Sequence, residues 1–173
     1  MMIEYIKDFN LKETIFIDAN IFSYHHLNHP KFGEICTKFL QRVENGEINA
    51  VTSSLVIDEV AFVILVEKGC EILKTDKTWK VKERIKEDKE FAKNCYEAVK
   101  QFLSYINFLR EIGLSIVEIR FEDINLSTDI ASQYMLLPHD AIHISVMKKY
   151  GIKNIATADP DFIRVKEIKV WKP

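Results

Sequence analysis

The sequence lacks most features that mark secreted, membrane or fibrous proteins. Its three cysteines are odd in number and never form a Cys-x-x-Cys pair, which argues against a disulfide framework and a zinc ribbon. Five glycines and four prolines in 173 residues give no sign of a fibrous or disordered chain. There is no apolar run of about 18 residues and no leader-like amino terminus. These absences predict a soluble, cytoplasmic protein with no membrane partner.

A strong excess of either charge is also missing. The net charge is -2 and the calculated pI is about 6.2, so no global positive field indicates nucleic-acid binding. One local exception is the stretch 74–93, where eight basic residues face five acidic ones and Trp79 stands among them. This stretch is either a solvated connector that Trp79 anchors to the core, or a surface for a polyanion on which Trp79 offers a stacking ring.

Short apolar runs alternate with segments of helical periodicity, which predicts a parallel α/β sheet. We expect one domain, residues 1–173, with three layers (α/β/α), a mostly parallel sheet of four to five strands, and an extended helical insertion over about 68–113. The strands are expected at 14–17, 48–52, 114–119, 152–157 and 168–171, with the last at an edge. The helices are expected at 20–27, 30–45, 55–67 (closed by Gly69), 91–109, 123–135 and 138–150.

Four acidic residues lie where an apolar run gives way to a turn or helix: Asp18, Glu59, Asp140 and Asp159. In open parallel sheets, ligands bind at the carboxyl ends of the strands. Each acid alone is also compatible with a helix cap or a turn. Because several carboxylates brought together repel one another, a divalent cation best explains their convergence, and oxygen ligands favour Mg²⁺ or Mn²⁺.

The chemistry expected of such a site is hydrolysis of a phosphodiester bond. A bound cation lowers the pKa of a coordinated water and offsets charge on the phosphate and leaving oxygen. No covalent protein nucleophile is required. From the residues alone, a metal-dependent ribonuclease, a DNA nuclease or phosphatase, and a non-catalytic docking module that holds a structural ion all remain possible.

The motifs around these acids resemble the motif blocks of PIN domains, and most of all those of VapC-type toxin ribonucleases. The matching segments are Ile-Asp18-Ala-Asn20, Ser-x-x-x-x-Glu59, His-Asp140-Ala-Ile-His143 and Thr157-Ala-Asp159-Pro-Asp161-Phe162. The resemblance implies that the four acids bind Mg²⁺ or Mn²⁺ and cleave RNA, with Asn20 and Thr157 in support. It also implies a small antitoxin protein as partner and a homodimer. The segment 68–113 is longer than in compact members of the family.

Three features around this site have more than one interpretation. Asp161 either joins the metal shell or caps the turn at Phe162. The pairs His25/His29 and His139/His143 have the i, i+4 spacing of helical zinc ligands, but we favour packing or groove-wall roles, and His143 is predicted to donate to an acid of the cluster. The segment 68–113 either selects substrate, covers the site or forms a dimer surface.

Overall fold

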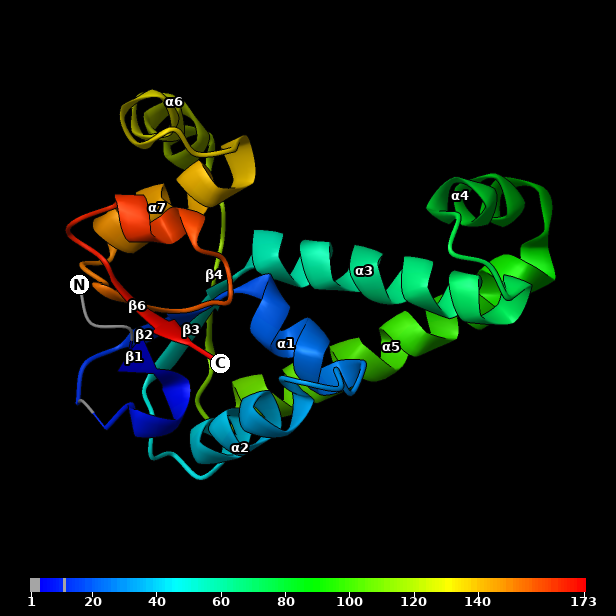
Figure 1. Ribbon diagram of the computed structural model, residues 1–173, viewed down its shortest axis with the longest axis horizontal. Coiled ribbons are helices and arrows are strands. Elements are labelled where there is room, and N and C mark those ends of the chain that lie inside the picture. The colour runs from blue at the N-terminus through cyan, green and yellow to red at the C-terminus, as the bar shows by residue number, and fades with distance from the viewer. Residues whose placement is uncertain (1–3, 11) are drawn as a thin grey trace.

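The computed structural model describes residues 4–10 and 12–173, which fold into a six-stranded sheet flanked by helices (Figure 1). All strand pairs are parallel and the strand order is β1-β6-β5-β2-β3-β4. The strands are β1 (Glu4–Tyr5), β2 (Ile15–Ile17), β3 (Ala50–Ser53), β4 (Ser115–Val117), β5 (Asn154–Ala156) and β6 (Lys169–Lys172). The predicted three-layer α/β architecture with a parallel sheet is therefore confirmed, with one strand more than expected.

The additional strand corrects the position of the last one. β1 pairs with β6 through Glu4 opposite Trp171 and Tyr5 opposite Lys172, so β6 lies between β1 and β5. The prediction that the last strand forms an edge was wrong, because a two-residue strand of Glu and Tyr carries no apolar pattern that could announce it.

Seven α-helices and two short 3-10 helices complete the described chain. They are η1 (Ile6–Asp8), α1 (Ala19–His26), α2 (Gly33–Glu44), α3 (Ser54–Leu73), α4 (Thr78–Glu87), α5 (Lys89–Glu111), α6 (Phe121–Tyr134), α7 (Pro138–Lys149) and η2 (Asp161–Arg164). Pro30 was predicted in the first turn of a helix, but α2 begins only at Gly33. Among residues 4–10 and 12–173, no helix has the length and apolar character needed to cross a bilayer.

Helix α3 also differs from the prediction, because it continues through Gly69 to Leu73. A Cβ atom at Gly69 would lie 2.2 Å from Val81 Cγ1 of α4, far inside van der Waals contact. The glycine therefore serves a close helix–helix approach and does not end the helix. From the sequence alone, a glycine after a helical stretch predicts a helix end, because the sequence pattern contains no information about a neighbouring helix.

The distal half of α3, all of α4 and the first half of α5 project away from the sheet, and we call this segment, residues 65–98, the arm (Figure 1). The arm has a small apolar cluster of its own around Val81, Phe91 and Cys95. The second half of α5, with Phe102 and Ile106, packs into the main core instead. One continuous helix therefore joins the two clusters.

The centre of the sheet is the most deeply buried part of the molecule. Ile15, Phe16 and Ile17 of β2 are fully buried, and β2 pairs with β5 on one side and β3 on the other. Burying each such side chain contributes about 1.5–3 kcal/mol relative to leaving it in water. The positions of the residues that follow the carboxyl ends of these strands are therefore fixed by the buried strands.

Candidate active site

Asp18 directly follows β2 and is the N-cap residue of α1. Its Oδ1 accepts a hydrogen bond from the Ala19 amide at 2.7 Å. Its Oδ2 accepts from Asn20 Nδ2 and from Thr157 Oγ1, each at 2.6 Å. Because this buried carboxylate has three donors, its orientation is set before any ligand arrives.

Asn20 and Thr157 also fix the loop that follows β5. The Asn20 side chain donates to Thr157 Oγ1 at 3.0 Å and accepts from the Ala158 amide at 2.9 Å. Thr157 Oγ1 accepts in turn from the Asp159 amide at 3.0 Å. The two residues that the motif resemblance named as supporting groups therefore connect the chain at Asp18 to the chain at Asp159, 141 positions later in the sequence numbering.

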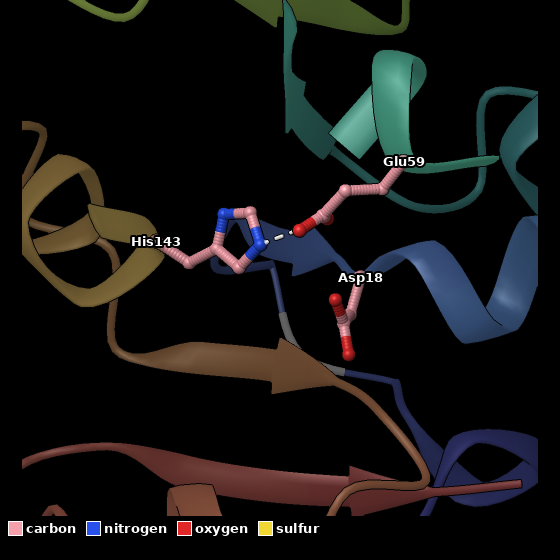
Figure 2. Close-up of side chains that lie close together, drawn as sticks. All are labelled: Asp18, Glu59 and His143. Carbon is pink, nitrogen blue, oxygen red and sulfur yellow. Dashed lines mark hydrogen bonds and ion pairs between the residues drawn. The ribbon is translucent and has the colours of Figure 1, made fainter. Parts of the chain in front are cut away.

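Glu59 lies in α3 and faces two histidines of α7. His139 Nδ1 lies 2.7 Å from Glu59 Oε1, and His143 Nε2 lies 3.2 Å from Glu59 Oε2. Figure 2 shows Glu59 between His143 and Asp18, each from a different element. Burial raises the pKa of Glu59, but the hydrogen bonds and charges of His143 and His139 outweigh it, so the pKa is lower than usual.

The buried imidazole of His143 has one partner only. Its ring is 1% exposed and its Nδ1 has no hydrogen-bond partner in the described structure. A proton on Nδ1 would be a buried donor without an acceptor, which costs about 1–3 kcal/mol. Nε2–H is therefore the donor to Glu59.

Asp140 lies in the first turn of α7, where Pro138 is the first helical residue. Burial raises its pKa to about 6, and the negative charges of Asp159, Asp18 and Glu59 add to this effect while His143 opposes it. The other three predicted acids therefore lie within electrostatic reach of Asp140.

The donor atoms suit a hard divalent cation. Asp18, Glu59 and His143 each have a polar atom within 4.8 Å of the others, and Asp140 lies within electrostatic reach of Asp18, Glu59 and Asp159. Burial raises the pKa of Asp18 above its usual value, and His143 and the hydrogen bonds from Thr157 and Ala19 oppose this effect. Carboxylate oxygens fit Mg²⁺ or Mn²⁺, whereas His143 Nε2 faces Glu59 and supports that carboxylate.

Asp161 is directed elsewhere. Its carboxylate forms an ion pair with Arg164 at 2.8 Å, and its amide donates to Asp159 Oδ1 at 2.7 Å. Asp159 Oδ1 therefore accepts from the first amide of η2, whose N-cap residue is Pro160.

His25 and His29 lie in the packing between α1 and α2, and the His26 ring lies against Phe102 of α5. His25 Nδ1 lies 2.8 Å from Thr37 Oγ1, and His29 Nδ1 accepts from the amides of Lys31 and Phe32. In the other pair, the spacing of His139 and His143 correctly marked a shared helix face, but sequence reasoning gave His139 no contact. Its partner Glu59 lies 80 positions away, and no local signal connects the two.

Comparison with known proteins agrees with this geometry. The PIN domain family model matches residues 15–168. Ribonuclease VapC2 of Methanocaldococcus jannaschii is 29% identical over 160 residues, which are 92% of this chain and 93% of that protein. Ribonuclease VapC6 of the same organism is 25% identical over 92% of this chain and 97% of that protein.

Two solved structures share the fold at 15% identity. VapBC2 from Rickettsia felis, crystallised with a DNA fragment from its promoter, matches with a TM-score of 0.51 over 92% of this chain and 98% of that one. Mycobacterium tuberculosis VapC20, a toxin that cleaves the sarcin-ricin loop, matches with a TM-score of 0.55 over 87% and 94%. At this identity the likeness concerns the fold alone.

Proposed function

Because the chain belongs to the PIN domain family, we propose that it is a metal-dependent endoribonuclease that hydrolyses RNA phosphodiester bonds. The observation that supports this proposal is the group formed by Asp18, Glu59 and His143, with Asp140 in electrostatic reach of Asp18, Glu59 and Asp159. The curated relatives with the names VapC2 and VapC6 are ribonucleases, which supports the same reaction class.

In this proposal the four acids hold Mg²⁺ or Mn²⁺ and the RNA phosphate binds against it. When bound, the cation supplies a more acidic water and offsets negative charge on the phosphate. Asn20 and Thr157 keep the Asp18 carboxylate pointed into the pocket through their 2.6 Å hydrogen bonds. They act as positioning residues and need not touch the substrate.

His143 has the same kind of role toward Glu59. It donates from Nε2 and is held by burial and by the Phe16 ring, whose centroid lies 5.6 Å away. His139 binds the other oxygen of the same carboxylate. We infer that the two imidazoles fix the direction in which Glu59 presents its oxygens, and that the exposed His139 contributes less than the buried His143.

We further propose that the protein is the toxin of a toxin–antitoxin pair, with a small antitoxin protein as partner and a homodimer as its assembly. The support is the naming of both curated relatives as VapC proteins and the fold shared with a VapBC complex. Copurification with the product of an adjacent small gene, and the mass of the purified protein in solution, test these two parts separately.

The test of the reaction is a cleavage assay on labelled RNA and single-stranded DNA with Mg²⁺, with Mn²⁺ and with chelator. We expect cleavage of RNA only, in the presence of metal, by the wild type and by Asp129→Asn, which alters an exposed carboxylate of α6. Asp18→Asn should be inactive. Cleavage that persists in chelator, or in Asp18→Asn, would contradict the proposal, and cleavage of DNA would replace RNA as the substrate.

A further inference from the structure

Helix α4 packs against the rest of the arm through one face, and its aromatic residue Trp79 lies outside that face. Val81 is fully buried against Gly69, and Ile85 packs beside it. Trp79 is 54% exposed, so the prediction that it anchors this segment to the core was wrong. The buried residues are two and six positions further along the helix, which turns Trp79 toward the opposite side.

The lysines around Trp79 also lack acidic partners. Of the eight basic residues in the stretch 74–93, all of them within the described chain, Arg84 alone forms an ion pair, with Asp88 at 2.8 Å. Two lysines lie over aromatic rings instead: Lys80 is 5.7 Å from the Trp79 ring centroid and Lys82 is 5.1 Å from that of Phe62. These charges remain available to a negatively charged ligand.

The contact between Lys82 and Phe62 connects this surface to the acid cluster. Phe62 is 50% exposed and lies three residues after Glu59 on α3, which is a rise of about 4.5 Å on the same helix face. On α4, Trp79, Lys82 and Lys86 are spaced i, i+3 and i+7 and so share one face. We call the four residues Phe62, Trp79, Lys82 and Lys86 the arm track.

Two exposed rings with lysines beside them match the chemistry of single-stranded RNA. Each base can stack on an aromatic ring, and each phosphate can meet an ammonium group. A duplex offers no free base faces, and an apolar protein partner would leave the lysine charges unmatched.

We propose that the arm track binds the single-stranded RNA segment next to the phosphate held at the acid cluster, with bases against Phe62 and Trp79 and phosphates at Lys82 and Lys86. The proposal rests on the ribonuclease function above and assigns the arm the part of a substrate-binding surface. Residues remote from the reacting bond then contribute to the affinity for RNA without taking part in the chemistry.

The test is binding of a labelled 12-nucleotide single-stranded RNA to the metal-free protein in chelator, where cleavage does not intervene. Trp171 is buried at 4% exposure, so quenching of tryptophan fluorescence by RNA reports Trp79. We expect Phe62→Ala to weaken binding roughly five- to hundredfold, the scale of one lost stack. Lys82→Glu should weaken it as well and reduce the salt slope by about 0.7. The matched control is Lys153→Glu, which alters an exposed lysine that precedes β5, away from the carboxyl ends of the strands.

Each outcome bears on the track in a definite way. Quenching together with weaker binding by both track variants, with melting temperatures unchanged, supports the proposal even if the wild type fails to cleave RNA when metal is added. If the wild type cleaves RNA but its arm-track variants bind RNA as well as it does, the arm track is not an RNA-binding surface. The ribonuclease function would then still stand. Absence of RNA binding by the wild type overturns both. A track variant that changes only the mass of the protein in solution would assign this face to a second copy of the chain.

Discussion

The acid cluster and the arm treat their polar groups in opposite ways. At the cluster, Asp18 has three hydrogen-bond donors and Glu59 has one imidazole on each oxygen. On the arm, seven of the eight basic residues between 74 and 93 have no ion-pair partner within the described chain. The carboxylates that we propose to bind a cation are held by the protein, whereas most of the arm lysines that we propose to face RNA have no ion-pair partner.

The strongest test of this comparison removes a cluster charge. Asp18→Asn or Asp140→Asn should lower RNA cleavage by a factor of about 10² or more, because a preorganised charge at the reacting phosphate is lost. The fold should be as stable as before or more stable, because repulsion among the acids falls. Cleavage rates and thermal melting measure the two effects, and active mutants would remove the cluster from the mechanism.

A smaller effect is expected when a positioning residue is removed. His143→Ala should weaken Mn²⁺ binding by about 10–100-fold, the range for groups that orient a metal ligand. His143→Gln should restore part of it, since its amide can still donate to Glu59, and His139→Ala should cost less because that ring is 61% exposed. Calorimetric titration with Mn²⁺ measures the affinity. Equal Mn²⁺ affinity in His143→Ala and wild type would contradict the positioning role of His143.

The packing of the arm can be weakened by a substitution that lies outside the acid cluster. Gly69→Ala should destabilise the packing of α4 on α3 by about 1–3 kcal/mol, because the new methyl group collides with Val81. In Gly69→Ala, the rate of amide hydrogen exchange should rise in α4 and stay unchanged in β2. The double variant Gly69→Ala with Val81→Ala should recover part of the loss. Faster exchange across the whole sheet in Gly69→Ala would mean that the arm and the core unfold as one unit.

The smallest effect concerns α6 against α7, the helix that carries Asp140. Lys149 donates to both oxygens of the buried Asp123, which also accepts from the Arg120 amide at 2.9 Å. Burial raises the pKa of Asp123, but these bonds outweigh it, so the pKa lies below its usual value.

The stability from this pair should therefore be complete above the unfolded pKa of about 4 and be lost as the pH falls through the lower folded value. Asp123→Asn should cost about 1 kcal/mol at pH 7, since Lys149 is partly exposed. Urea unfolding at pH 7 and pH 3 measures the difference from wild type, which should shrink at pH 3. An equal difference at both values would assign the cost to packing instead of charge.

Prediction from sequence succeeded where the signal is local. The apolar runs before Asp18 and Asp159 gave β2 and β5. It failed where a neighbour distant in sequence decides. From the sequence, Gly69 is interpreted as a helix end, whereas the structure shows that it lies against Val81. The last strand is interpreted as an edge strand, whereas Glu4 and Tyr5 pair with it.

The sequence by itself determined five of the six strands, the order of the acids along the chain and the chemical class of the site, because strand burial and carboxylate chemistry are properties of short segments. Only the tertiary structure decided that His139 and His143 contact Glu59, that Asp161 pairs with Arg164, and that the Lys82 ammonium lies over the Phe62 ring. Most of these contacts join helices or turns whose relative placement depends on packing across the whole molecule, and side-chain spacing in the sequence does not encode that placement.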